Sequence, residues 1–325
     1  AVTFIPLWVA PNLVTLIGFF FELFSFVMSY ILSEGLTKPI PSWACFVNGI
    51  CLAIYQLLDN LDGRQARRTC NSSPLGQFFD HGCDAITGVS ELFKIAASFN
   101  LGITAETFYF IFIMGFGFFL TSWEEYVNHR FYLGPINGPD EGLTLLYIAH
   151  LAVGFCPELQ FIAKTNAIKY IFLISAALTI GSILVSVIRH CIQNPESWKI
   201  AVVSVLPCLI STAIFVTLQM NNEKAANDIH FIMSAGYVLQ YGAQVIIVSC
   251  LVNRPPLRLF NIQTILLWII ALCAFFIPGI NDIRHFWKFY YYLIVGIMVL
   301  YDIDVIFGLS KGLEIHPLKI KPNTI

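Results

Sequence analysis

The chain of 325 residues is 57% hydrophobic and only 12% charged, and it contains 29 phenylalanines. Soluble domains carry about twice that share of charge, so we expect an all-α, polytopic integral membrane protein rather than a soluble one. The formal net charge of −2 supplies no basic patch for a nucleic-acid partner.

Apolar stretches of about 20 residues predict ten membrane-spanning helices. We place these helices at 12–32, 42–60, 75–97, 106–127, 141–156, 167–188, 199–219, 229–251, 259–277 and 286–308. No connecting stretch is long enough to fold by itself, and no internal repeat is visible. Residues 1–325 are therefore interpreted as a single membrane domain.

The first predicted helix begins at Pro11 and Asn12, which are typical of a helix start. Thr15 follows one turn later, and Glu22 lies deeper in the same stretch. Glu22 is either a buried polar partner or part of a cavity wall. Farther along the chain, Glu91 and Lys94 are spaced three residues apart, which predicts an ion pair within the bilayer.

The most informative stretch, DNLDGRQARRTCNSSPLGQFFDHGCD, covers residues 59–84 between the second and third predicted helices. Its carboxylates form two pairs, Asp59 with Asp62 and Asp80 with Asp84, each on one face of a helix. Four carboxylates brought together repel one another unless cations neutralise them. Because oxygen ligands favour hard ions, we expect two Mg²⁺ ions, with Mn²⁺ as an alternative.

Smaller and basic residues separate the two pairs. Gly63, Ala66 and Gly76 allow a ligand to approach the backbone, and Arg67 suits a phosphate group. His81 directly follows the third aspartate, where a neutral imidazole can accept a hydroxyl proton near pH 7. We expect His81 to be the base, with Asp84 as the alternative.

The motif reads Asp-x2-Asp-Gly-x2-Ala-Arg-x8-Gly-x3-Asp-x3-Asp without a gap or substitution. This is the signature of the CDP-alcohol phosphotransferases, and the flanking segments PLWVAPNLVTLIGF and QARRTCNSSPLGQFFDHGCD resemble the eukaryotic choline/ethanolamine phosphotransferase branch. The resemblance implies transfer of phosphocholine or phosphoethanolamine, or both, from CDP-choline or CDP-ethanolamine to diacylglycerol, with release of CMP. It also implies a membrane of the endoplasmic reticulum or Golgi, and a further segment before Ala1.

The resemblance assigns roles outside the motif as well. Asn12 becomes a contact of the CDP-alcohol, with Thr15 a weaker candidate. Glu141 matches the position of an acidic residue that the family places near the site, where it would orient the base or the alcohol head group. An ordinary acidic helix start explains Glu141 equally well.

The distribution of lysine and arginine predicts orientation. With ten spans, the motif lies on the same side as both ends of the chain, and that side holds most of the basic residues, so the motif is expected to face the cytosol. The first six predicted helices would surround the site. Helices seven to ten would serve lipid access or the packing of a homodimer, with Gln240 and Gln244 forming hydrogen bonds between helices.

Three alternative functions remain open from the sequence. A sister enzyme would use CDP-diacylglycerol and a soluble alcohol such as inositol. An intramembrane prenyltransferase also binds pyrophosphate through aspartate-held magnesium, but its acidic motifs generally lie on separate halves of the chain. A cation or proton transporter could use the carboxylates as a relay, although the three arginines near them do not favour this.

Overall fold

The computed structural model describes residues 2–129, 138–164, 166–255, 259–277, 279–280 and 285–320. The helices are α1 (Pro11–Leu32), α2 (Ser42–Arg68), α3 (Pro74–Ser98), α4 (Ala105–Asn128), α5 (Gly138–Phe155), α6 (Asn166–Gln193), α7 (Ser197–Asn221), α8 (Glu223–Ala226), α9 (Ile229–Leu251), α10 (Ile262–Phe276) and α11 (Phe286–Leu313), with short 3-10 helices at Val2–Phe4 and Pro157–Lys164. No strand occurs in these ranges, which confirms the all-α fold class.

Within the described ranges, seven helices are long and apolar enough to cross a membrane, namely α1, α2, α4, α6 from Phe172, α7, α9 and α11. The apolar parts of α5 and α10 are shorter. The remaining predicted span lies on α3, which is long enough at 25 residues but carries several charged side chains. A helix thus lies at each of the ten predicted positions, and the chain is a polytopic integral membrane protein.

Several helices extend beyond the predicted spans: α6 ends at Gln193 rather than 188 and α11 at Leu313 rather than 308, and the largest difference is at the end of α2. The second span was expected to end at residue 60, but α2 continues to Arg68, so Asp59 and Asp62 lie on one helix, as their spacing predicted. Hydropathy detects where a chain leaves the apolar layer, whereas a helix continues as long as its residues favour it. Both aspartates of the first pair therefore project from one continuous helix.

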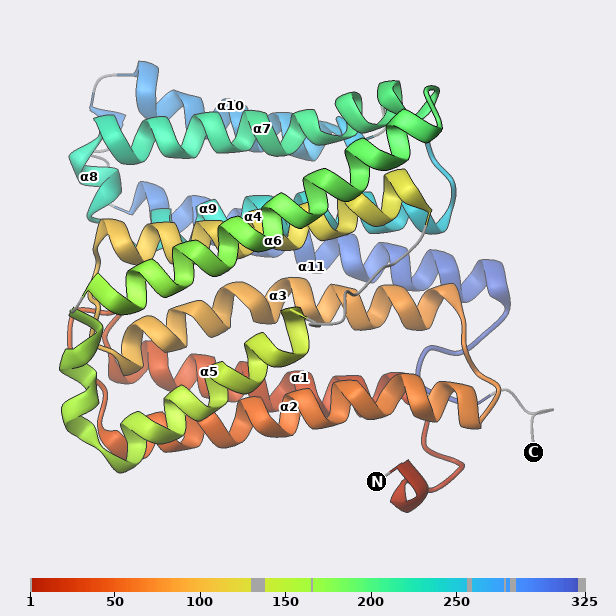
Figure 1. Cartoon of the computed structure of the whole chain (residues 1–325), viewed down its shortest axis with the longest axis horizontal. Helices are drawn as coiled ribbons and strands as arrows, with labels where there is room; N and C mark the ends of the chain where they lie inside the picture. Colours follow the sequence, from red (N-terminus) through yellow and green to blue (C-terminus); the bar gives the residue numbers. More distant parts are fainter. Residues whose placement is uncertain are drawn as a thin grey trace.

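The long helices run back and forth along a common axis, with α1 and α2 along one edge of the bundle and α7 and α10 along the opposite edge (Figure 1). The start of the chain, the α2–α3 turn and the end of α11 gather at the same end of the bundle. On the first edge, α1 packs on α2 and α3, and α2 packs on α5. This arrangement places the motif beside both ends of the described chain.

Helix α9 forms the centre of the bundle and is buried along nearly its whole length. It packs on α4, α3 and α11. A Cβ atom added to Gly115 of α4 would lie 3.0 Å from the carbonyl oxygen of Gly236 on α9, so small residues allow these two helices to approach closely. Helix α3 consequently has α1 on one side and α9 on the other.

Candidate active site

The motif is folded around the turn that joins α2 to α3. The chain leaves α2 through Cys70, whose φ of +53° reverses its direction. Ser73 then caps α3 by accepting a hydrogen bond from the backbone nitrogen of Gly76 at 3.2 Å, and Pro74 is the first helical residue. This short turn returns the second pair of aspartates toward the first.

The end of α2 also anchors the segment before α1. Arg68 donates from Nη1 to the carbonyl oxygens of Val2 at 2.8 Å and Ile5 at 2.7 Å. Buried Gln65 donates from Nε2 to the carbonyl oxygens of Pro6 and Val9, both at 3.1 Å. These bonds hold the start of α1 against the motif.

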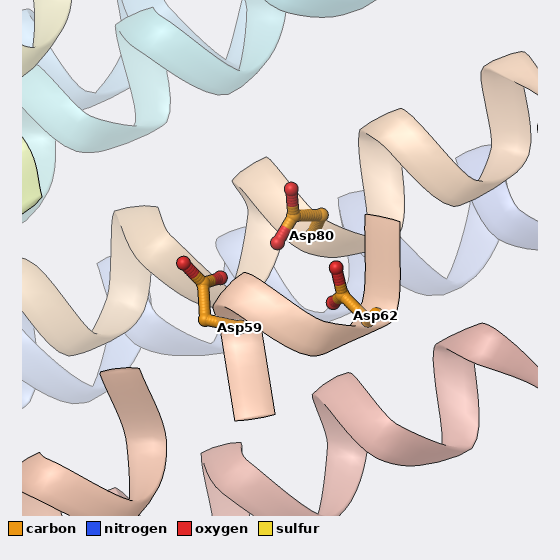
Figure 2. Close-up of side chains that lie close together, drawn as sticks. All are labelled: Asp59, Asp62 and Asp80. Carbon is orange, nitrogen blue, oxygen red and sulfur yellow. The ribbon is translucent and has the colours of Figure 1, made fainter. Parts of the chain in front are cut away.

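Three of the four predicted metal ligands come together. Asp59 and Asp62 project from α2 toward Asp80 of α3 (Figure 2), and one carboxylate oxygen from each lies within 4.8 Å of the others. Asp62 is only 6% exposed. The Oδ1 atom of Asp80 is buried and has no hydrogen-bond partner among the described residues. Such an all-oxygen, all-negative group fits a hard divalent cation.

The fourth predicted ligand, Asp84, is not part of this group of three. Its carboxylate accepts a hydrogen bond from the hydroxyl of Tyr55 on α2. Tyr55 in turn accepts a hydrogen bond from Thr87 at 3.3 Å. The structure therefore shows Asp84 oriented by Tyr55 of α2.

Two hydroxyl groups hold the carboxylates in place, and sequence reasoning recognised neither role. Thr15 of α1, the weaker candidate contact of the CDP-alcohol, donates to Asp62. Tyr55 was missed entirely, although it stands four residues before Asp59 and so lies on the same face of α2. Both contacts cross between helices, so spacing within one helix could not assign them.

Two predicted substrate-binding residues lie side by side. Asn12 is 9% exposed, and a Cβ atom added to Gly76 would lie 3.4 Å from its Oδ1 atom. The Nδ2 atom of Asn12 donates to the carbonyl oxygen of Pro317 at 2.9 Å. The segment after α11, which includes Pro317 and Lys319, therefore reaches the start of α1. There it lines a small cavity together with Asn71 and Ser73.

The other predicted contacts occupy the outer end of α2. A Cβ atom added to Gly63 would lie 3.6 Å from Nη1 of Arg67, which is exposed, and Ala66 is partly exposed between them. This surface is accessible to a phosphate from solvent. Gly63 and Ala66 contribute no bulk that would block such a ligand.

His81 and Glu141 lie at the edges of the site. His81 is half-buried and directly follows Asp80 on α3. Glu141 is exposed in the first turn of α5, one turn before Thr144, which exchanges hydrogen bonds with Gln56 of α2 at 3.1 and 3.3 Å. Gln56 stands three residues before Asp59, so α5 begins near the level of the carboxylates.

A second charged cluster lies deeper along α3. Lys94 is fully buried, and its Nζ atom lies 2.6 Å from Glu22 and 2.6 Å from Glu91. Buried His150 of α5 lies 2.7 Å from the other oxygen of Glu91 and 2.8 Å from the hydroxyl of Ser98. The predicted Glu91–Lys94 pair is confirmed, and Glu22 is a buried ionic partner rather than part of a cavity wall.

Comparison with known proteins points to one family. The sequence pattern of the CDP-alcohol phosphatidyltransferase family matches residues 8–180. Choline/ethanolaminephosphotransferase 1 of Arabidopsis thaliana is 43% identical over 145 residues, which cover 45% of this chain and 37% of that protein. Cholinephosphotransferase 1 of Saccharomyces cerevisiae is 39% identical over 152 residues, which cover 47% of this chain and 39% of that protein.

A longer match has lower identity. The uncharacterized CDP-alcohol phosphatidyltransferase class-I family protein 1 of Dictyostelium discoideum is 26% identical over 337 residues, which cover 98% of this chain and 86% of that protein. The matched stretch spans less than half the length of the Arabidopsis and Saccharomyces proteins. The family pattern, at residues 8–180, includes all four aspartates of the motif.

Proposed function

Because this chain belongs to the CDP-alcohol phosphatidyltransferase family, whose pattern matches more than half of it, we propose that it transfers phosphocholine or phosphoethanolamine, or both, from the CDP-alcohol to diacylglycerol. The products are the corresponding phospholipid and CMP. The observation that carries the proposal is the approach of the Asp59, Asp62 and Asp80 carboxylates to within 4.8 Å of one another at the family motif.

The aspartate carboxylates are proposed to bind metal ions. Asp59, Asp62, Asp80 and Asp84 would hold two divalent ions, which we propose to be Mg²⁺. Bound ions of this kind neutralise the diphosphate of the donor and the charge that develops on departing CMP. The hydroxyls of Thr15 and Tyr55 orient Asp62 and Asp84, so the ligand oxygens are held in position before the donor arrives.

The remaining residues bind the donor and move a proton. Arg67 pairs with a phosphate, while Gly63, Ala66 and Gly76 leave space for the nucleotide and Asn12 contacts it. His81 takes the hydroxyl proton of diacylglycerol, and the acceptor oxygen bonds to the β-phosphorus as the bond to the bridging oxygen breaks. CMP leaves with the electron pair of that bond. Glu141 orients His81 or the alcohol head group.

The same proposal includes the setting of the enzyme. We propose that the motif faces the cytosol from a membrane of the endoplasmic reticulum or Golgi, where a soluble nucleotide donor reaches it directly. The chain forms one domain and assembles as a homodimer. Diacylglycerol reaches the site from the bilayer, so one substrate comes from water and the other from lipid.

The test is a transfer assay with purified protein in lipid nanodiscs. Diacylglycerol and Mg²⁺ are supplied with CDP-choline or CDP-ethanolamine, and released CMP and the lipid product are measured. We expect equal amounts of CMP and phospholipid with at least one donor, and loss of both on chelation of the metal. Product only from CDP-diacylglycerol and inositol would assign the sister activity, and ion flux without CMP would assign a transporter.

A further inference from the structure

A group of three polar side chains, those of Gln240, Gln244 and Asp302, lies on the opposite side of α3 from α1, where α9 and α11 pack against α3. Gln244 of α9 donates from Nε2 to an oxygen of Asp302 on α11 at 3.0 Å. Asp302 faces Gly82 of α3, because a Cβ atom added there would lie 3.9 Å from its Oδ1 atom. Two turns deeper, a Cβ atom added to Gly88 would lie 3.2 Å from Nε2 of Gln240.

Most polar atoms of this group lack partners in the described structure. Both side-chain polar atoms of Gln240, the Oε1 atom of Gln244 and the Oδ1 atom of Asp302 are buried without a hydrogen-bond partner. Gln240 and Gln244 are 0% exposed. Within a membrane an unmet polar group is expensive, and native proteins rarely retain one without a ligand or a bound water to satisfy it.

The chemistry of the group restricts the ligand. An amide nitrogen needs an acceptor, whereas amide and carboxylate oxygens need hydroxyl or other donors. The carboxylate of Asp302 repels phosphate, so a CDP-alcohol and a phospholipid head group are both disfavoured. A neutral glycerolipid, with ester carbonyl oxygens and a free hydroxyl, offers both kinds of partner and no negative charge.

The position of the group connects it to the proposed reaction. Gly82, which Asp302 faces, is the residue next to His81. The half of α11 that carries Asp302 is only partly covered, and most of its residues between 299 and 310 retain some exposure. A lipid can therefore reach Asp302 from the side of α11, while Gln240 and Gln244 remain inside the bundle.

We propose that Gln240, Gln244 and Asp302 bind the glycerol oxygens of the diacylglycerol acceptor and so place its free hydroxyl near His81. This inference rests on the proposed function and adds the acceptor site to it. The sequence had suggested only hydrogen bonds between helices for the two glutamines. In the structure, neither glutamine satisfies both ends of its amide in that way.

The test replaces Gln240 and Gln244 by leucine, separately, in protein held in nanodiscs of defined composition. We expect the KM for diacylglycerol to rise about tenfold in each variant, equivalent to about 1.4 kcal/mol. The KM for CDP-choline or CDP-ethanolamine should stay within about twofold. The thermal midpoint of the substrate-free protein should not fall in Gln240→Leu, because leucine there removes only polar atoms without a partner among the described residues, whereas Gln244→Leu also removes the hydrogen bond to Asp302 and should lower the midpoint.

Gln160→Leu is the matched control. Gln160 is also buried, but its Nε2 atom donates to the carbonyl oxygen of Ile40 at 3.2 Å, far along the chain from the motif. This substitution should lower the thermal midpoint and leave both KM values unchanged. Asp302→Asn retains an oxygen for Gln244 and should raise the acceptor KM by a smaller factor.

Two results would overturn the acceptor site. An unchanged diacylglycerol KM in Gln240→Leu and Gln244→Leu would mean that bound water or packing satisfies the glutamines. An equal rise in the donor KM would mean that the group shapes the whole site. Failure of the proposed function is a separate result, since the unaltered protein would then release no CMP with either donor.

Discussion

Helix α3 carries two charged clusters that differ in composition: one gathers like charges, and the other pairs opposite charges. Near the start of α3, Asp80 meets the carboxylates of Asp59 and Asp62, with one oxygen of each within 4.8 Å of the others. Deeper in α3, Lys94 lies between Glu22 and Glu91, and His150 contacts the latter. The deeper cluster pairs acidic groups with basic ones, whereas the first brings like charges together, which favours a bound cation.

The comparison separates structural charge from charge that binds a ligand. In the deeper cluster, each ionisable group has a partner from another position in the chain, so it fastens α1, α3 and α5 together. In the motif, like charges are held together by hydroxyl groups such as those of Thr15 and Tyr55. A fold that holds like-charged carboxylates close together is typical of a site that binds a cation.

Asp80→Asn should have the largest effect on function. It removes one of three converging carboxylates, so CMP release should fall about a thousandfold or more with either donor, since metal ligation supplies several kcal/mol. At 100 times its Kd, Mg²⁺ should raise the stability of the unaltered protein by about 2.7 kcal/mol, which is measured as a higher thermal midpoint. Mg²⁺ should not change the thermal midpoint of the variant. Transfer above a tenth of the original rate would contradict the metal assignment.

His81→Ala should remove transfer while sparing the donor site. Loss of a general base lowers turnover by roughly a hundredfold to ten-thousandfold. Binding of CDP-choline, measured by calorimetry in the presence of Mg²⁺, should change little because the carboxylates are intact. Near-normal turnover in this variant would transfer the base assignment to Asp84.

Lys94→Met should disturb the deeper cluster and affect folding rather than chemistry. Removing the shared cation leaves Glu22 and Glu91 as buried like charges, which should lower the free energy of unfolding by about 3–5 kcal/mol. The measurement is the thermal midpoint and the yield of folded protein. Lys38→Met is the control, because its ion pair with Glu34 is exposed and should contribute less than about 1 kcal/mol.

Tyr55→Phe should have the smallest effect of the four substitutions, and it tests the role of Asp84. It removes the hydroxyl that donates to Asp84 and preserves the ring, so kcat should fall about tenfold while the fold is retained. Tyr126→Phe is the matched control, since its hydroxyl donates to the backbone carbonyl oxygen of Arg254 at 2.6 Å and not to a motif carboxylate. Equal losses in both variants would indicate a general effect of removing a tyrosine hydroxyl.

Much of the fold and part of the site could be predicted from the sequence. Apolar length located a helix at every expected position, because only a helix satisfies its own backbone within a membrane. Spacing of three and four residues placed each aspartate pair on one helical face. Local composition could not locate the end of α2, because Asn60–Arg68 is polar yet helical.

Contacts between distant helices were decided only by the tertiary structure. Nothing local in Glu22 identifies Lys94 as its partner, and nothing in Asn12 indicates the carbonyl oxygen of Pro317. The same holds for Tyr55 with Asp84 and for Gln244 with Asp302. The sequence by itself determined which side chains carry charge and which helices bear them. How those helices pack determined which charges are neutralised within the protein and which require a ligand, because Coulomb and hydrogen-bond energies depend on distance in space.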